Sequence, residues 1–206
     1  MNDLLATAPP SLAALYRDEA ACRRCDLYRT ATQVVPGEGD RGAALMLVGE
    51  QPGDREDLAG KPFVGPAGRL LDRALAAAAV PRDKVFVTNA VKHFKYELRG
   101  KRRLHKRPDA GEIEACRWWL DLERSLVRPQ AILAMGATAA RGLFGRAVTI
   151  SSARHGVHTL ADGTKARVTI HPSLLLRLQD EADKLAEYER FVADLKAAAA
   201  LAGLAA

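Results

Sequence analysis

Short apolar runs alternate along the chain with longer segments in which apolar residues recur at helical spacing. The runs predict strands at 43–48, 84–88 and 131–135, followed by a hairpin of 158–160 and 166–170 around an Ala-Asp-Gly-Thr turn. The longer segments predict helices at 11–22, 67–80, 108–127, 136–144 and 181–201. Residues 148–154 favour a looser strand or loop, and 171–173 a loop or helical turn. Strands separated by helices predict an α/β fold, a three-layer α/β/α sandwich with a central, mainly parallel sheet.

The connection between the first strand and its helix, residues 47–71, is rich in glycine, proline and acidic residues and carries one aromatic residue, Phe63. This composition lets a ligand approach the backbone closely. Polar residues also follow the predicted strands: Glu50, Gln51, Asp54, Asn89 and His171. Because parallel strands end at a common edge, the pattern predicts a binding crevice there. Each residue alone also suits an ordinary loop.

The length of 206 residues suits one domain, residues 1–206, with 1–10 as a loose arm. No signal peptide and no apolar run long enough to cross a membrane is apparent, so we expect a cytoplasmic protein without membrane contact. No extended apolar patch stands out, and a monomer is the default expectation.

The net charge of +6 is concentrated in one segment. Residues 92–107 hold eight Lys and Arg against the single acid Glu97, a balance of +7, so the rest of the chain carries −1. Such a segment indicates contact with a polyanion. A solvated charged loop is the alternative. Aromatic residues and histidines interleaved with these charges favour nucleic acid.

Three cysteines suggest a metal site in a reducing compartment. Cys22 and Cys25 form a CxxC at the end of the first predicted helix, and Cys116 lies on a distant one. A site with four ligands needs one more donor, and His93, just after the second strand, is the first choice. Three unrelated thiols are the equal alternative.

Four motifs occur in order: Gly49-Glu-Gln-Pro-Gly53, Lys61-Pro-Phe-Val-Gly65, Thr88-Asn-Ala-Val-Lys92 and His171-Pro-Ser173. Together they resemble the motif series of the type-4, iron–sulfur uracil-DNA glycosylases. The resemblance covers the chain from Cys22 to about Arg177. It implies a [4Fe-4S] cluster held by Cys22, Cys25, His93 and Cys116, although members of that group usually carry a cysteine where this chain has His93.

Two departures resemble a narrower branch, the UdgX-type enzymes. The usual GEAPG is GEQPG here, and a basic insertion, Gly100-Lys-Arg-Arg-Leu-His-Lys106, follows the third ligand. In that branch a histidine of this loop bonds covalently to the sugar after uracil has left. The resemblance implies that His105 plays this part, with Leu104 replacing the usual isoleucine.

The resemblance also assigns roles to the polar residues at the crevice. Phe63 would stack on the flipped uracil, Asn89 would read its pairing edge, and Gly49 and Gln51 would contact it. His171 would stabilise the leaving uracil and Glu50 would orient His105, while Gln51 and Asp54 would shape the sugar side. Phosphate contacts are expected from Lys92, Lys101, Arg102, Arg103 and Ser173.

The expected substrate is uracil-containing DNA, preferably single-stranded because the base is then more easily extruded. Two alternatives stay open. One is a glycosylase that turns over in the ordinary way. The other is a non-catalytic nucleic-acid-binding module stabilised by zinc.

Overall fold

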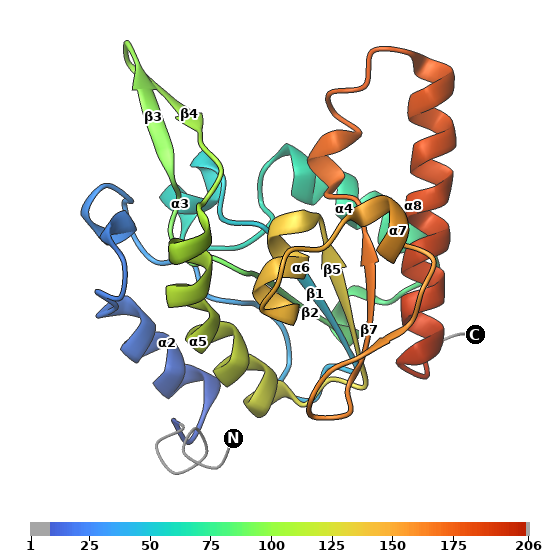
Figure 1. Ribbon diagram of the computed structural model, residues 1–206, viewed down its shortest axis with the longest axis horizontal. Coiled ribbons are helices and arrows are strands. Elements are labelled where there is room, and N and C mark those ends of the chain that lie inside the picture. The colour runs from blue at the N-terminus through green and yellow to red at the C-terminus, as the bar shows by residue number, and fades with distance from the viewer. Residues whose placement is uncertain (1–8, 205–206) are drawn as a thin grey trace.

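The computed structural model describes residues 9–204, which form an α/β sandwich around a five-stranded sheet (Figure 1). The strand order is β2 (Val85–Asn89), β1 (Leu45–Gly49), β5 (Ala131–Met135), β7 (Lys165–Thr169) and β6 (His158–Thr159). The first four strands are parallel, and β6 is an antiparallel edge strand. The predicted fold class and the hairpin of the last two strands are therefore confirmed.

Helices cover both faces of the sheet. Their bounds are α2 (Leu12–Ala20), α3 (Asp54–Ala59), α4 (Pro66–Ala77), α5 (Ala110–Val127), α6 (Ala137–Phe144), α7 (Ile150–Ala153) and α8 (Glu181–Leu201). Short 3-10 turns occur at η1 (Asp26–Arg29), η2 (Arg82–Lys84) and η3 (Pro172–Leu174). Helices α4 and α8 pack on one face, α5 and α6 pack on the other, and α2 lies outside α5.

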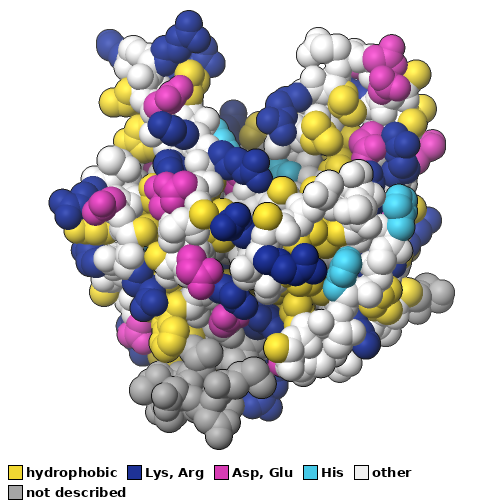
Figure 2. All heavy atoms as spheres, viewed as in Figure 1, with side chains coloured by type: hydrophobic (Ala, Val, Ile, Leu, Met, Phe, Trp, Pro, Cys, Tyr) yellow, Lys and Arg dark blue, Asp and Glu magenta, His cyan; other side chains and the backbone are white. Residues whose placement is uncertain are grey.

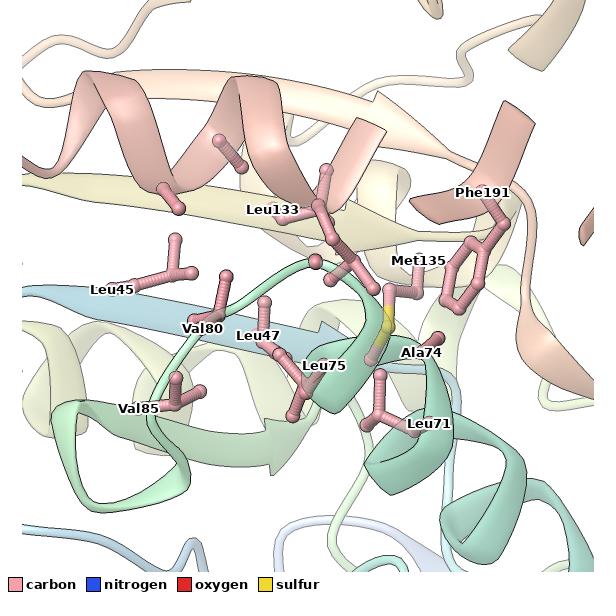
Figure 3. Packing of buried hydrophobic residues seen from close by; sticks show 14 of the residues in the cluster. Leu45, Leu47, Leu71, Ala74, Leu75, Val80, Val85, Leu133, Met135 and Phe191 are labelled. Carbon is pink, nitrogen blue, oxygen red and sulfur yellow. The ribbon is translucent and has the colours of Figure 1, made fainter. Parts of the chain in front are cut away.

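The core explains why β1, β2 and β5 are continuous apolar runs. Every residue of these strands is buried, as expected for parallel strands covered on both faces. On one face, Leu47 and Leu133 meet Leu71 and Leu75 of α4, and Phe191 of α8 packs beside them (Figure 3).

Capping residues fix the helix that later supplies a cysteine. Asp109 accepts a hydrogen bond from the Glu112 backbone N–H at 3.0 Å, and the Glu112 carboxylate accepts one from the Asp109 N–H at 2.8 Å. This capping box satisfies backbone donors in the first turn of α5.

Three segments differ from the sequence prediction. Residues 148–154 contain the short helix α7 rather than a strand, and α3 was not expected. The basic insertion forms a second sheet, the hairpin of β3 (Tyr96–Arg99) and β4 (Arg102–His105). Gly100 takes φ of +61° in its two-residue turn, a conformation that glycine adopts without strain.

Two sequence expectations concern the ends of the chain and membranes. Most of the expected loose arm, residues 1–8, lies outside the described part of the chain. Among the described helices, none combines the length and the apolar character needed to span a bilayer.

Candidate active site

A pocket of about 1050 Å³ opens at the carboxyl ends of the parallel strands, the edge that the sequence predicted. It lies between two projections of the molecule, the β3–β4 hairpin and the segment that joins β7 to α8 (Figures 1 and 2). Eight of the predicted site residues line it: Glu50, Gln51, Asp54, Phe63, Asn89, His105, His171 and Ser173. Residues from separate strand ends therefore meet in one cavity.

Gly49 allows two side chains to close over the end of β1. A Cβ atom at this position would lie 2.4 Å from Asn89 Oδ1 and 2.6 Å from Phe63 Cζ. Any larger residue would therefore displace an amide or an aromatic ring. Asn89 is buried at the end of β2 and lines the pocket, and its amide carries both hydrogen-bond donors and an acceptor.

Phe63 occupies a strained backbone conformation. Its φ of +57° is left-handed, which costs a non-glycine residue about 1–3 kcal/mol unless its surroundings enforce it. Helix α4 enforces it, because a Cβ at Gly68 would lie 1.6 Å from the Phe63 carbonyl oxygen. The ring is stacked at 6.4 Å from the His171 ring. An aromatic face is thereby fixed at the pocket.

Glu50 is held by three partners at the pocket wall. Its Oε1 lies 3.1 Å from His105 Nε2, and its Oε2 accepts a hydrogen bond from Thr138 Oγ1 at 2.5 Å. Arg107 Nε donates to the same Thr138 hydroxyl at 3.1 Å. Burial alone would raise the pKa of Glu50, but the hydrogen bonds from His105 and Thr138 outweigh it and lower the pKa below its ordinary value. Glu50 is therefore a carboxylate that holds one nitrogen of a half-exposed imidazole.

His171 is held neutral and in one tautomer. Burial lowers its pKa to about 4, against the opposing charge of Glu50. The Ser173 backbone N–H donates to His171 Nδ1 at 3.2 Å, and Ser173 Oγ lies 2.8 Å from the same nitrogen. Because Nδ1 accepts, Nε2 carries the proton and serves as a neutral hydrogen-bond donor. Ser173 thus orients the His171 ring through both its hydroxyl and its backbone N–H.

The β3–β4 hairpin is fastened at its base by Gln51. The side-chain amide donates to the carbonyls of Lys95 and Lys106 at 3.0 and 3.1 Å and accepts from the Lys95 N–H at 3.1 Å. Lys95 directly precedes β3 and Lys106 directly follows β4, so both lie at the base of the hairpin. The Gln51 side chain therefore positions the hairpin, and the residue also lines the pocket.

Arg103 fastens the hairpin to α3. Its Nε lies 2.6 Å from Asp54 Oδ1 and its Nη1 lies 2.6 Å from Asp57 Oδ2. The guanidinium also lies 5.2 Å from the centre of the Tyr96 ring and 5.5 Å from that of Phe94. Arg103 and Asp54 therefore hold the loop in place. Within residues 9–204, the Arg103 guanidinium is thus engaged by two carboxylates, which argues against its expected phosphate contact.

The other basic residues divide into two groups. Lys101 and Arg102 are exposed at the tip of the hairpin, where Lys and Arg side chains gather (Figure 2). Lys92, in contrast, is fully buried, with Nζ 2.6 Å from Glu123 Oε2 and 2.5 Å from Thr88 Oγ1. The expected phosphate contact of Lys92 is therefore wrong, because its ammonium group lies inside the protein.

The predicted metal ligands gather where α2, α5 and the segment after β2 meet. Cys22, Cys25 and Cys116 belong to one cluster of packed side chains, and His93 is buried. Burial lowers the pKa of His93, the charge of Asp57 opposes this, and Arg23 of the CxxC segment adds to the lowering. Within residues 9–204, no three His, Cys, Asp or Glu side chains converge tightly enough to enclose a single metal ion.

Two N–H groups already point at the cysteine sulfurs. Trp119 Nε1 donates to Cys22 Sγ at 3.0 Å, and the Lys92 backbone N–H donates to Cys116 Sγ at 3.2 Å. Burial raises the pKa of Cys116 to about 12, against the charge of Lys92, so its thiolate needs a cation to persist. Donors aimed at both sulfurs suit thiolate ligands, since charged acceptors form the stronger hydrogen bonds.

Comparison with known proteins identifies the family. The sequence model of the uracil DNA glycosylase superfamily matches residues 36–196. The chain belongs to the uracil-DNA glycosylase superfamily. It is 35% identical over 173 residues to the type-4 uracil-DNA glycosylase of Archaeoglobus fulgidus, covering 81% of this chain and 83% of that protein. The type-4 uracil-DNA glycosylase of Thermotoga maritima is 36% identical over 157 residues, covering 76% and 78%. A type-5 uracil-DNA glycosylase of Pyrobaculum aerophilum is 29% identical over 185 residues, covering 81% and 77%.

Sequence reasoning missed four supporting residues of this uracil-DNA glycosylase superfamily site: Thr138, Arg107, Asp57 and Trp119. Thr138 lies 88 positions from Glu50, and no spacing rule connects them. Asp57 follows Asp54 by three residues, which places both on one face of a helix. This spacing could have identified Asp57, but only if helix α3 had been predicted.

Proposed function

We propose that the chain excises uracil from DNA, as the names of its curated relatives state for those proteins. The pocket supports this reaction. Phe63 offers a fixed ring against which a flipped base can stack, and the buried Asn89 amide can pair with the edge of uracil and reject the amino group of cytosine.

His171 is suited to stabilise the departing base. Glycosidic cleavage leaves a sugar with oxocarbenium character while negative charge grows on uracil. A neutral imidazole with Nε2–H in the pocket can donate a hydrogen bond to the uracil oxygen that gains this charge. A neutral donor also avoids neutralising Glu50 across the pocket.

We further propose that the chain is a UdgX-type enzyme in which His105 captures the sugar. The observation that carries this proposal is the contact of 3.1 Å between His105 Nε2 and Glu50 Oε1 at the pocket wall. While one ring nitrogen donates to Glu50, the other keeps its lone pair. The C1′–N1 bond breaks and uracil leaves with the electron pair. The free nitrogen then bonds to C1′, and the imidazolium proton passes to Glu50.

Cys22, Cys25, His93 and Cys116 would hold a [4Fe-4S] cluster. Such a cluster takes its protein ligands mainly from cysteine thiolates, and the three cysteines pack in one group of side chains. When bound, the cluster supplies cross-links between α2, α5 and the segment after β2. Its role is therefore structural.

The hairpin supplies the contacts to the DNA backbone. Lys101 and Arg102 are exposed at its tip and are free to bind phosphates. We expect a preference for single strands, because extruding an unpaired base costs less, and a monomeric protein. Gel filtration and competition between single- and double-stranded oligonucleotides test these two points.

The decisive experiment incubates the iron-loaded protein with a uracil-containing single-stranded oligonucleotide and separates the products on a denaturing gel. We expect a band that survives heat and detergent, and an intact mass that equals protein plus DNA minus uracil. His105→Ser should abolish this band, while His155→Ser, an exposed histidine away from the pocket, should leave it unchanged.

Each alternative has its own outcome. Free uracil without a stable band identifies a glycosylase that turns over. A cross-link that persists in His105→Ser refutes the assignment of the nucleophile. A colourless protein that binds zinc and releases no uracil would support the non-catalytic module, whereas equal amounts of iron and sulfide exclude it.

A further inference from the structure

A second cavity, of about 950 Å³, lies on the face of the molecule away from the predicted base pocket. It is formed by the last turns of α5 and α6 and by the β6–β7 turn. Its charged lining consists of Arg117, Arg124, Arg128, Arg146, Asp121 and Asp162. We refer to it as the arginine cleft. No role assigned above uses any of these residues.

The charges of the arginine cleft are unbalanced. Four arginines against two aspartates leave a formal charge of +2. Both aspartates bind Arg124, Asp121 through Nη1 at 2.7 Å and Asp162 through Nη2. Arg128 and Arg146 are exposed and form no ion pair within residues 9–204. The unbalanced arginines of this lining suit an anionic ligand that is not part of the chain.

Arg117 adds a third guanidinium, which is paired only loosely with Asp121. It packs over Gly145 at the end of α6, where a Cβ would lie 2.3 Å from its Nη1. Its Nε is 3.6 Å from Asp121 and, within the described part of the chain, this buried N–H and that of Arg124 have no hydrogen-bond acceptor. Groups fixed in this way are prepared for a ligand rich in acceptors.

The floor of the cleft is apolar and partly aromatic. Leu122, Leu143 and Leu160 line it, and the Phe144 ring meets the His158 ring edge-on at 5.3 Å. A basic rim with an aromatic floor is the combination by which proteins bind single-stranded nucleic acid without sequence preference. A free phosphate ion would use the rim but would leave the floor uncovered.

Helix α6 connects the arginine cleft to the base pocket. Gly136 and Ala137 at its start line the pocket, and Leu143 and Phe144 at its end line the cleft. Its 8 residues span about 12 Å. Lys and Arg side chains gather on this face, below the groove between the projections (Figure 2).

We propose that the arginine cleft binds the single strand of DNA that flanks the uracil, through its phosphates and one stacked base. This inference rests on the proposed DNA substrate. Arg117, Arg128 and Arg146 contact phosphates, and Phe144 supports the base. The strand thus passes from the base pocket along α6, and the enzyme holds more DNA than the pocket and hairpin alone.

The test measures fluorescence anisotropy of a labelled, uracil-free single-stranded 20-mer with the iron-loaded protein, at salt concentrations from 50 to 200 mM. The variant Arg128→Gln/Arg146→Gln should bind more weakly, and its salt dependence should fall by about 0.7 for each lost phosphate contact, or roughly 1.4 in total. The control Arg69→Gln/Arg73→Gln changes the charge equally on exposed residues of α4, on the opposite face of the sheet, and should behave as the parent.

Equal weakening in both variants, or unchanged binding in the cleft variant, would overturn the proposal. Calorimetry with thymidine monophosphate distinguishes a site for a DNA strand from a site for a small anion. If the parent binds the mononucleotide tightly and only the cleft variant loses this binding, while 20-mer binding is unchanged, the cleft is a mononucleotide site and the proposal is overturned. Uracil release is measured on the same preparations. If uracil is released but the cleft variant binds the 20-mer as the parent does, only the cleft proposal is refuted. If the variants bind the 20-mer as predicted but no uracil is released, only the glycosylase proposal is refuted.

Discussion

Two aspartates bind the same arginine from opposite environments, and this difference predicts two different mutational costs. Asp54 and Asp57 each lie 2.6 Å from Arg103, but the Asp54 side chain is 49% exposed whereas that of Asp57 is 0% exposed. Asp57 also accepts the Thr32 backbone N–H at 3.0 Å. An exposed ion pair contributes about 0.2–1 kcal/mol, because water screens it.

The buried Asp57 carboxylate contributes more to the free energy of unfolding than the exposed Asp54 carboxylate does. Breaking a buried pair costs about 3–5 kcal/mol when a charge is left without a partner, but Arg103 keeps Asp54 when Asp57 is neutralised. Loss of a charged hydrogen bond alone costs about 1.5–3 kcal/mol. We therefore expect Asp57→Asn to lower the free energy of unfolding by about 2–3 kcal/mol, and Asp54→Asn by less than about 1 kcal/mol.

Urea denaturation of both variants measures these losses, and amide hydrogen exchange locates them. In Asp57→Asn the hairpin amides should exchange faster, and the rate of adduct formation should fall, because β4 carries His105. Equal losses of stability in the two variants would refute the reasoning, since burial would then not decide the strength of the pair. So would faster exchange confined to segments outside the hairpin.

Three further predictions concern other parts of the chain. Lys92→Met should lower the free energy of unfolding in urea by about 3–5 kcal/mol, because it leaves the buried Glu123 carboxylate without its cation. His171→Gln should remove part of the pH dependence of stability: the pKa is about 4 in the folded protein and ordinarily 6.5, so the unfolded chain binds more protons in this window. The contribution of neutral His171 is therefore present above pH 6.5 and is lost as the pH falls toward 4. Trp119→Phe should speed the loss of iron to a chelator, followed by visible absorbance, because Cys22 loses its indole hydrogen bond.

Matched variants control these measurements. Lys101→Met at the exposed hairpin tip should leave stability within about 0.5 kcal/mol of the parent. Trp118→Phe changes the neighbouring indole, which stacks with Arg24 rather than with a cysteine, and should leave the rate of iron loss unaltered. If Trp118→Phe and Trp119→Phe lose iron equally fast, packing and not the hydrogen bond controls the cluster.

The sequence predicted the sheet and its helices because their signals are local. The strand at 131–135 and the helix at 181–201 were predicted with their observed bounds, since burial on both faces produces a continuous apolar run and an amphipathic helix repeats every 3.6 residues. The strand-end residues Asn89 and His171 were also found in this way. Parallel topology brings strand ends together whatever the side chains are.

The hairpin escaped prediction because tertiary contacts fix it. Each strand has only four residues on largely exposed faces, and although β3 alternates as Tyr-Glu-Leu-Arg, β4 reads Arg-Arg-Leu-His and carries no such pattern. Its position depends on Gln51 and Arg103, whose partners lie tens of residues away. The expected phosphate contact of Lys92 was wrong for the same reason, because its buried partner Glu123 lies 31 positions along the chain, on α5.

One segment controls both halves of the proposed chemistry. Gln51, Asp54 and Asp57 hold the hairpin, while Glu50 holds His105, and all four follow β1 directly. The same segment continues to Phe63 at the base pocket. A shift of this loop must therefore move the base-binding ring and the nucleophile together. Changes at the hairpin tip, which contacts none of these anchors, can alter the affinity for DNA alone. On the proposed mechanism, excision and capture are thus coupled through the loop after β1, and DNA binding can vary independently of both.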